Sequence, residues 1–469
     1  MKTIVWFRQD LRISDNPALL HACAQGEIIP VFIQDHHNAR QQGAASDWWL
    51  HHSLTSLNAS LEDRLQIYQG SSLKVLKELC DQYGATQVVW NRLYEPAIIK
   101  RDTEIKESLH GSGITVKSFN GRLLWEPMQI LKKDQTPYKV FTPYYRKGCL
   151  QAQPPRTPNV TPKDMRIIER AETSMTVGQL KLLPLIDWCS EFSQHWNPGE
   201  EGAKDKLQNF IKNAAQSYKR DRNIPDIQGT SRLSPHLHFG EMSPNQIWYA
   251  ILDNLDPNDE DIDCYLSELG WREFSHYLLF HFFHMEIQNF NAKFNHFPWK
   301  KDENLLTAWQ KGLTGIPIVD AGMRELRQTG YMHNRVRMIV GSFLVKNLLL
   351  DWREGEAWFW DCLLDADLAA NVASWQWVAG SGADAAPYFR IFNPVTQGQR
   401  FDENGEYVKR YCPELKKLPP KFIHDPWNAK PDILRACGVE LGNTYPKPLV
   451  DLKTSRQEAL DAFQVLKQV

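Results

Sequence analysis

Residues 367–394 read DLAANVASWQWVAGSGADAAPYFRIFNP, and this stretch gives the strongest indication of how the chain folds. From Asp365 the chain contains no proline or glycine until the glycines after the second tryptophan, which predicts a helix that begins at Asp365. On this helix Asp367, Asn371 and Trp375 would be spaced four residues apart and form one stripe. The stripe would present a carboxylate, an amide and an indole, which suits a flat heterocycle such as a flavin.

A second tryptophan in the same stretch would face another way. Trp377 is two residues past Trp375, about 200° farther around the helix axis, so it is available to a second planar partner. The alternative is that both rings are core packing and Asn371 is a satisfied buried amide, and this stretch alone favours that alternative. The glycines of GSGAD (380–384) are expected to end the helix rather than bind phosphate.

A second segment, CYLSELGWREFSHYLLFHFF (264–283), also predicts a helix, and it places Glu268, Trp271 and Arg272 on one face. An acid beside an indole could read a base edge while the ring stacks on the base, a contact of about 1–3 kcal/mol. The alternative is a packed Trp271 beside a surface pair of Glu268 and Arg272, which contributes about 0.3–0.5 kcal/mol.

A third segment, YMHNRVRMIVGSFLVKNLLLDW (331–352), puts Asn334, Arg337 and Met338 on one predicted helical face. Alone it is interpreted as a half-exposed helix.

Hydroxyl groups gather in GTSRLSPHLHFGEMSP (229–244). Ser234 followed by Pro235 has the form of an N-cap and a first helical residue. A helix N-terminus beside hydroxyls suits a pyrophosphate, and simple capping is an equal alternative. His236 and His238 have no third ligand beside them, so a metal site is not expected.

The first 125 or so residues alternate β-branched runs with helical patterns, which predicts a parallel sheet covered on both faces. No GxGxxG follows the first run, so the dinucleotide fingerprint of the Rossmann type is absent. The predicted strands are TIVWF (3–7), IIPVFI (28–33), LQIYQG (65–70), QVVWN (87–91) and ITVKSFN (114–120).

The remaining chain divides into a connector and a helical region. QAQPPRTPNVTPK (151–163) is typical of a surface connector, and from about residue 200 the apolar spacing is helical nearly throughout. We therefore expect an α/β domain over 1–130, a connector over 131–200 and a large all-α domain over 201–469.

The composition of the 469 residues is ordinary for a globular protein, and the net charge is −2. Any nucleic-acid surface must therefore be a local basic patch. The 8 cysteines include no CxxC pair, which argues against a zinc site and a disulfide framework. No signal peptide or membrane span is evident, so a cytoplasmic protein is expected.

Several long motifs resemble those of the DNA photolyases and cryptochromes, in the same order along nearly the whole chain. They run from VWFRQDLRISDNPAL (5–19) through GTSRLS, ELGWREF, TGYMHNRVRM, DWREGE and DADLAAN to FIHDPW (422–427). The resemblance implies an antenna-chromophore domain followed by a helical domain that holds FAD in a U shape. The FAD contacts that it implies are Tyr218, Thr230, Ser231, Arg232, Leu233, Ser234, Arg337, Asp365, Asp367 and Asn371.

The resemblance also implies roles for individual residues. Asn371 would lie near flavin N5, where plant cryptochromes carry aspartate, and this favours repair over signalling. Trp375, Trp352 and Trp299 match the proximal, middle and exposed positions of a relay that passes electrons to the flavin. Tyr331 stands where many relatives have tryptophan.

The substrate positions follow the pattern of enzymes that act on cyclobutane pyrimidine dimers. Enzymes for the (6-4) photoproduct have histidine where this chain has Asn334, and DASH relatives differ around DLAAN. The chain thus resembles a deoxyribodipyrimidine photo-lyase: photoexcited reduced FAD would donate an electron to a flipped-out dimer, whose radical anion Glu268 would stabilise. The substrate positions are Glu268, Trp271, Asn334, Met338 and Trp377.

The expected partner is ultraviolet-damaged DNA, bound by a monomer without a metal or a membrane. A blue-light-sensing cryptochrome is the alternative, although only about 40 residues follow FIHDPW where cryptochromes usually add a long extension. A non-photochemical flavoprotein is a further alternative that the motifs disfavour. The candidate DNA-binding cations are Lys219, Arg220, Arg222, Arg272, Arg335, Arg390, Lys409, Arg410, Lys416, Lys417 and Lys421.

The antenna chromophore is expected to be methenyltetrahydrofolate. Ala97, Ile98 and Glu286 occupy the positions of the enterobacterial folate site and do not match it. FNGRLLWEP and NFNAKFNHFPW instead resemble the class III photolyases.

Overall fold

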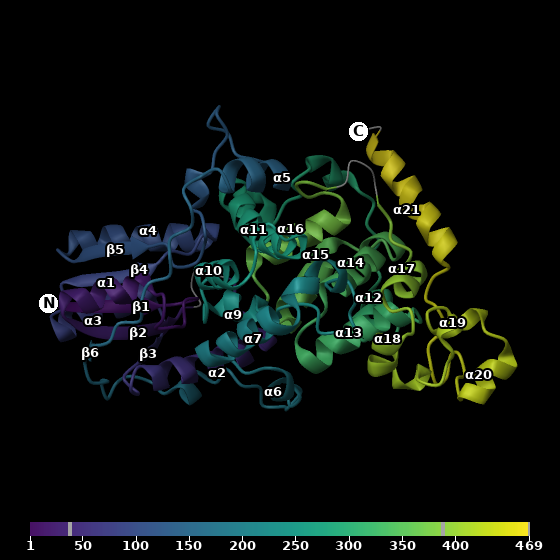
Figure 1. The fold of residues 1–469 in the computed structure, drawn as a ribbon, viewed down its shortest axis with the longest axis horizontal. Helices are drawn as coiled ribbons and strands as arrows, with labels where there is room; N and C mark the ends of the chain where they lie inside the picture. The colour runs from purple at the N-terminus through teal and green to yellow at the C-terminus, as the bar shows by residue number, and fades with distance from the viewer. Residues whose placement is uncertain (36–39, 386–389, 468–469) are drawn as a thin grey trace. The chain divides into compact units, whose positions relative to one another are not determined.

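The computed structural model describes residues 1–35, 40–385 and 390–467, so part of the DAAPYFRIFNP motif lies outside the described residues. The chain divides into two compact units. Figure 1 labels their helices and strands along the chain. The first unit comprises Met1–Asn213 and Ser231–Phe283, and the second comprises Ala214–Thr230 and His284–Val469.

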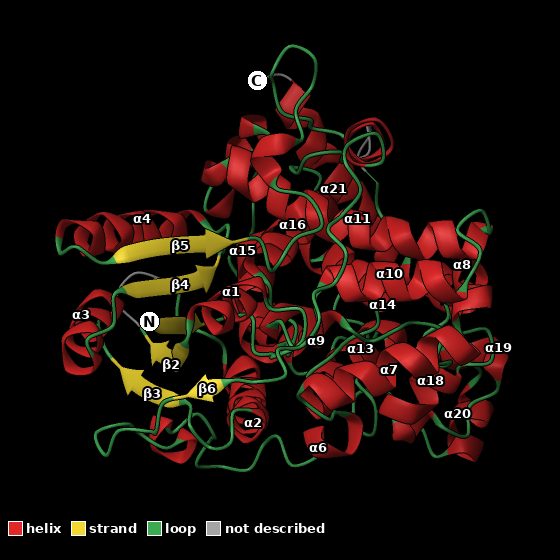
Figure 2. Cartoon of the chain, turned by 60° about the vertical axis from the view of Figure 1, so that its left-hand side comes forward, coloured by secondary structure: helices red, strands yellow, loops and turns green. Residues whose placement is uncertain are grey.

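The first unit contains a parallel sheet with the strand order β3-β2-β1-β4-β5. In Figure 2, β4 and β5 are seen side by side as yellow arrows. All five predicted strands and their parallel arrangement are confirmed. They are β1 (Lys2–Phe7), β2 (Glu27–Gln34), β3 (Gln66–Gln69), β4 (Gln87–Asn91) and β5 (Thr115–Phe119).

A sixth strand was not predicted. β6 (Arg166–Ile167) pairs in parallel with β2, inside the segment expected to be a connector. Two residues are too few to show a strand period, so this pairing had no signal in the sequence.

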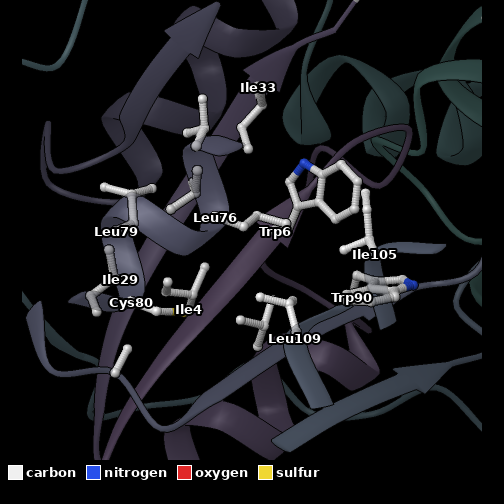
Figure 3. Close-up of a cluster of buried hydrophobic side chains, with 14 of the residues drawn as sticks. Ile4, Trp6, Ile29, Ile33, Leu76, Leu79, Cys80, Trp90, Ile105 and Leu109 are labelled. Carbon is white, nitrogen blue, oxygen red and sulfur yellow. The ribbon is translucent and has the colours of Figure 1, made fainter. Parts of the chain in front are cut away.

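Helices pack against the sheet because its strands are apolar on both faces. Residues of one face, such as Ile4, Trp6 and Trp90, share a core cluster with Leu76 and Leu109 of the covering helices (Figure 3). The opposite face is also buried and packs against α1. The helices of this part are α1 (Pro17–Gln25), α2 (Ala44–Ser60), α3 (Ser72–Tyr83) and α4 (Pro96–Gly111).

The rest of the first unit combines irregular segments with helices, among them the long helix that the second segment predicted. Its helices are α5 (Phe141–Pro143), α6 (Phe192–His195), α7 (Glu200–Asn213), α9 (Ser234–Phe239), α10 (Pro244–Asn254) and α11 (Glu260–His281).

The second unit is helical, as predicted, and its described residues contain isolated bridges but no strand. None of the helices that the structure describes is both long and apolar enough to cross a membrane. Its helices are α8 (Tyr218–Asp221), α12 (Glu303–Gln310), α13 (Pro317–Thr329), α14 (Asn334–Ser342), α15 (Trp352–Cys362), α16 (Leu368–Ala379), α17 (Pro394–Phe401), α18 (Glu406–Tyr411), α19 (Pro420–Ile423), α20 (Pro431–Cys437) and α21 (Leu452–Lys467).

Candidate active site

Helix α16 carries the stripe of Asp367, Asn371 and Trp375, but it does not begin at Asp365 as predicted. Asp367 is its N-cap, with extended backbone angles and a carboxylate that accepts a hydrogen bond from the Ala370 amide at 2.9 Å. This capping bond fixes the helix start at Leu368. The helix ends before Gly380, whose φ of 92° is left-handed, so the predicted role of the glycines as a terminator is confirmed.

The side chain of Asn371 is held by a residue of α15 for which no role was predicted. Its Nδ2 donates to the carbonyl of Glu356 at 3.0 Å and to the Glu356 carboxylate at 2.8 Å, and both side chains are buried. Two acceptors on one side fix the orientation of the amide, so only Oδ1 can serve another ligand. Glu356 belongs to the DWREGE motif, which was the one signal that could have pointed to it.

Trp375 lies against α15 in a space shaped for its ring. The ring packs edge-on against Phe359 at 5.0 Å and Trp309 at 6.2 Å between centroids. A Cβ atom on Gly355 would lie 2.1 Å from Cη2 of Trp375, so only glycine fits there. The packing of the second unit therefore dictates where this indole lies.

The other two relay candidates lie on neighbouring segments of the second unit. Trp352 is the first residue of α15 and is fully buried, and its Nε1 donates to Oδ1 of Asn289 at 2.9 Å. Trp299 is half-buried, and its neighbour Lys300 donates its backbone N–H to the carbonyl of Leu349 at 2.7 Å. Trp375 and Trp352 are therefore buried, and only the predicted outer tryptophan, Trp299, is partly exposed.

A charged pair joins α14 to the segment before α16. Nη2 of Arg337 donates to Oδ2 of Asp365 at 2.9 Å, and the guanidinium lies 5.0 Å from the centre of the Tyr331 ring. Burial alone would lower the pKa of Arg337, but Asp365 and Tyr331 outweigh it and hold that pKa above its ordinary value. The Tyr331 ring therefore contacts the cation of this charged pair.

The first turn of α14 lies in a group of arginines that we call the arginine cluster: Arg222, Arg335 and Arg400. Arg335 donates to Oδ1 of Asn223 at 2.6 Å and lies over the Phe401 ring at 4.4 Å. Burial lowers the pKa of Arg335, and the charges of the other two arginines lower it further. Like charges this close favour the approach of an anion.

The remaining second-unit candidates differ in exposure. Asn334 is exposed and Met338 is half-buried on α14, one turn apart, so the predicted face is present. Trp377 is half-buried on α16, whereas Trp375 is buried. Among the candidate DNA-binding cations of this unit, Arg220 forms an ion pair with Asp221, and Lys409 forms one with Glu406.

In the first unit, α11 carries Glu268, Trp271 and Arg272, all half-buried. The Trp271 ring stacks on Phe141 with centroids 3.8 Å apart and planes at 12°, so only its other side is available to a ligand. Sequence reasoning missed Phe141, because 130 residues separate the two rings and no local pattern links them.

Arg272 binds atoms of its own unit. Its Nη1 donates to the Arg122 carbonyl and to the Glu273 carboxylate, both at 3.1 Å. Burial raises the pKa of Glu273 to about 7, although this carboxylate also accepts hydrogen bonds from the backbone of Leu124 and Trp125. These contacts account for Arg272 without a ligand, and the predicted DNA contact stays a prediction.

The hydroxyl run differs from its prediction at one residue. Ser234 is not the N-cap of α9: Leu233 occupies that position, and Ser234 is the first helical residue, with an exposed side chain. Arg232 takes a left-handed φ of 51°, so the turn into the helix is completed one residue early. Ser231 hydrogen-bonds the side chain of Tyr265.

His236 is buried and bonded to the Glu241 carboxylate. Within the described residues, no group of three or more histidine, cysteine, aspartate or glutamate side chains could hold a metal ion.

Comparisons with known proteins match the chain along its whole length. Residues 3–163 match the family model described as DNA photolyase, and residues 265–465 match the FAD binding domain of DNA photolyase. The chain is 48% identical to a deoxyribodipyrimidine photo-lyase of Agrobacterium fabrum, over 99% of this chain and 98% of that protein. It is 39% identical to Cryptochrome-2 of Arabidopsis thaliana, over 97% of this chain and 78% of the relative.

A solved structure is equally similar. The crystal structure of a bacterial class III photolyase from Agrobacterium tumefaciens superposes with a TM-score of 0.96 at 48% identity, over 100% of this chain and 98% of that one.

Proposed function

Because the chain belongs to the DNA photolyase and cryptochrome family, we propose that it is a deoxyribodipyrimidine photo-lyase that splits cyclobutane pyrimidine dimers in DNA with light. Its greater identity to a named photolyase, 48%, than to a cryptochrome, 39%, supports repair over signalling. The 265–465 segment is an FAD-binding domain by its family match, so the cofactor is FAD.

Residues that the resemblance assigns to the cofactor would hold the flavin. Asn371 has its Nδ2 hydrogens directed to Glu356, which leaves Oδ1 as an acceptor for the N–H of a reduced flavin ring. Asp367, Asp365 and Arg337 would supply the remaining polar contacts, and Tyr218 would pack against the cofactor. The run Thr230, Ser231, Arg232, Leu233 and Ser234 would hold the pyrophosphate through hydroxyls and backbone N–H groups.

When bound, reduced and excited by light, FAD supplies the electron that opens the cyclobutane ring and takes it back afterwards. The protein's task is to hold the flipped-out dimer dry and in place. Trp271 would stack on it with the side of its ring that Phe141 does not cover. Glu268 would hydrogen-bond the dimer and stabilise the charge that it gains, with Asn334, Met338 and Trp377 completing the substrate contacts.

The tryptophans would return the cofactor to its reduced state. Trp375 would donate to the flavin, Trp352 to Trp375, and the half-exposed Trp299 would take an electron from a reductant in solution. The partial exposure of Trp299, beside the burial of Trp352 and Trp375, supports the assignment, because an electron entry point must be reachable from solvent.

The arginine cluster supports binding to DNA by a protein of net charge −2. Arg335 is half-buried among like charges, an arrangement that a phosphate would stabilise. Flipping a dimer out of the duplex costs a few kcal/mol, and less for a poorly stacked lesion, which favours damaged sites.

The antenna and the organisation of the chain complete the proposal. The 1–130 domain would hold methenyltetrahydrofolate, the 131–200 segment would connect, and the 201–469 domain would carry FAD and the substrate. The protein would act as a monomer without a metal ion. Acid extraction of the purified protein, followed by chromatography of the released chromophores, identifies the antenna.

The observation that best supports this function is the 48% identity to a photolyase over the full length of the chain. Photoreactivation in cells tests the proposed function. Bacteria that lack their own photolyase are transformed with the chain, irradiated with ultraviolet light, and then kept in blue light or in darkness. We expect blue light to raise survival with the wild-type chain and not with Glu268→Ala/Trp271→Ala. Equal survival in light and darkness, with FAD-loaded protein present, would identify a light sensor instead.

A further inference from the structure

Two successive stacked ring pairs in the first unit end on Trp271. The Trp271 and Phe141 rings are 3.8 Å apart between centroids, with their planes at 12°. The Phe141 and Tyr145 rings are 5.5 Å apart, with their planes at 9°. Phe141 and Tyr145 are buried, whereas Trp271 is half-buried. The indole that the sequence predicts to meet the substrate is therefore backed by two rings from the segment expected to be a connector.

The two supporting rings come from one short helical segment. α5 (Phe141–Pro143) continues directly into a π-helical turn over Tyr144–Cys149. The rings are four residues apart, and side chains at this spacing lie on the same face of a helix. Turns of the π-helical kind are rare and occur frequently at functional sites. The segment thus brings both of its rings together to α11.

The segment is fixed to α11 at two further points. A Cβ atom on Gly270 would lie 2.6 Å from Cδ2 of Tyr145, so α11 has room for this ring because residue 270 lacks a side chain. The guanidinium of Arg146 donates to both carboxylate oxygens of Asp263, at 2.6 and 2.5 Å. Both contacts lie on α11, the helix that carries Trp271, so the supporting rings cannot shift freely against the indole.

The preference of the rings for one another does not explain their close contact. Aromatic pairs favour offset or edge-on arrangements with centroids about 4.5–7 Å apart, because the faces of two rings carry like charge. The surrounding packing must therefore hold Phe141 and Trp271 face to face. Phe274 contacts the indole edge-on at 5.9 Å and restricts it from a second direction. The orientation of the Trp271 ring is thus set before a ligand binds.

We propose that Phe141 and Tyr145 are positioning residues, which hold the Trp271 ring in the orientation that stacks on a flipped-out pyrimidine dimer. This inference rests on the proposed function. A side chain that becomes ordered only on binding lowers the affinity, and a ring that is already held does not. The two residues would raise the affinity for damaged DNA through Trp271, with no effect on undamaged DNA.

The test measures the binding of ultraviolet-irradiated and unirradiated oligothymidine to FAD-loaded protein in darkness, where no dimer is repaired. Phe141→Leu and Tyr145→Leu stay apolar but lose a flat ring, whereas Tyr145→Phe keeps the ring. We expect both leucine variants to bind irradiated oligothymidine about fivefold more weakly, the factor for ordering one side chain on binding. Their affinity for unirradiated oligothymidine should not change. Tyr145→Phe should bind both like the wild type.

A second background shows whether Phe141 acts through the indole. In Trp271→Ala the addition of Phe141→Leu should cause no further loss of affinity, because the ring to be positioned is absent. A merely structural role would give the same loss in both backgrounds. That result, or a Phe141→Leu protein that binds irradiated oligothymidine like the wild type or loses affinity for both oligonucleotides equally, would overturn the inference.

Phe192→Leu is the matched control, because it removes a buried ring of the same unit that packs edge-on against Trp48 at 5.4 Å. We expect its affinities for both oligonucleotides to equal those of the wild type. Thermal unfolding and FAD content confirm that each variant is folded.

A spectroscopic readout needs no DNA. In protein labelled with 5-fluorotryptophan, Trp271→Phe identifies the fluorine resonance of Trp271, and the ring face of Phe141 shifts that resonance. We expect Phe141→Leu to move the resonance and to broaden it, because the indole then samples several orientations. A Trp271 resonance that is unchanged in Phe141→Leu would show that Phe141 does not hold the ring.

The outcomes separate this inference from the proposed function. If the wild type binds both oligonucleotides equally and repairs no dimers in light, the proposed function is wrong and this inference is wrong with it. If the wild type prefers irradiated oligothymidine and repairs it, but Phe141→Leu retains the full preference, only this inference is wrong.

Discussion

At the scale of single residues, the position of Trp375 depends on a glycine. The ring is surrounded by Phe359, Trp309 and the backbone of α15, and a methyl group on Gly355 would lie 2.1 Å from it. The relay role proposed for Trp375 requires that the ring keep its distance to donor and acceptor. The lack of a side chain at Gly355 therefore allows the Trp375 ring to lie where it does.

Replacing Gly355 with alanine should displace the Trp375 ring. We expect Gly355→Ala to lower the free energy of unfolding by about 1–3 kcal/mol, as overpacking does, and to slow photoreduction of bound FAD. Thermal unfolding and the flavin absorbance under blue light measure the two effects. Gly111→Ala is the matched control, because a Cβ there meets nothing within 4 Å. Unchanged stability and photoreduction in Gly355→Ala would contradict the packing argument.

A substitution at Trp352 distinguishes a role in photoreduction of FAD from a role in dimer repair. Trp352→Phe keeps a buried ring but removes a redox-active indole and its hydrogen bond to Asn289. We expect photoreduction to slow at least about tenfold, and the unpaired Asn289 to lower stability by about 1–3 kcal/mol. Repair by protein that has been reduced chemically should stay at the wild-type level. If that repair fell together with photoreduction, Trp352 would serve the flavin site and not an electron path.

At the scale of elements, α16 shows how one side chain serves both fold and site. The Asp367 carboxylate caps the helix through the Ala370 amide, and the same residue is proposed to face the cofactor. Asparagine can cap as well as aspartate but carries no charge. The pair of substitutions Asp367→Asn and Asp367→Ala therefore separates the two roles.

We expect Asp367→Ala to lower the free energy of unfolding by about 1 kcal/mol, and Asp367→Asn to leave it nearly unchanged. Both should weaken FAD binding if the charge is what the cofactor requires. Denaturant unfolding of the FAD-free protein and fluorescence titration with FAD provide the measurements. If Asp367→Asn binds FAD with the wild-type affinity, Asp367 caps the helix and its charge does not contribute to FAD binding.

The elements also show what could be predicted from the sequence. The strands β1 to β5 and the helices α11 and α16 have local sequence signals that depend only on neighbouring residues, and all of them were predicted, although α16 begins at Leu368 and not at Asp365. The Ser234 cap was wrong because the left-handed turn at Arg232 depends on surroundings that a local pattern does not contain. β6 was missed because it is a strand only through its pairing with β2.

For the candidate site, the sequence predicted the residues on each helix but not the partners that hold them in place. The spacing placed Asp367, Asn371 and Trp375 on one helix, and the family resemblance supplied their roles. The residues that orient them were missed, because Glu356 binds Asn371 and Phe141 stacks on Trp271 across distances in sequence that no motif spans. Assigning each of these residues to FAD, to the dimer or to the relay stays a prediction.

At the scale of the whole molecule, a protein of net charge −2 must bind a polyanion through local charge. If about four phosphates are contacted, the logarithm of DNA affinity should fall with the logarithm of salt concentration at a slope near −3.6. Arg335→Gln should make that slope shallower by about 1 and weaken damaged and undamaged DNA alike. Lys453→Gln, at an exposed position on α21, is the control. A flat salt response would show that the arginine cluster is not a DNA surface.

The most direct test of the account is the loss of cyclobutane dimers from ultraviolet-irradiated oligothymidine, mixed with photoreduced protein in blue light and in darkness. We expect the dimers to disappear only in the light, and Glu268→Ala to lower the number of dimers repaired per absorbed photon more than it lowers the FAD content. If FAD is bound and photoreducible but dimers persist in the light, the chain is not a dimer photolyase.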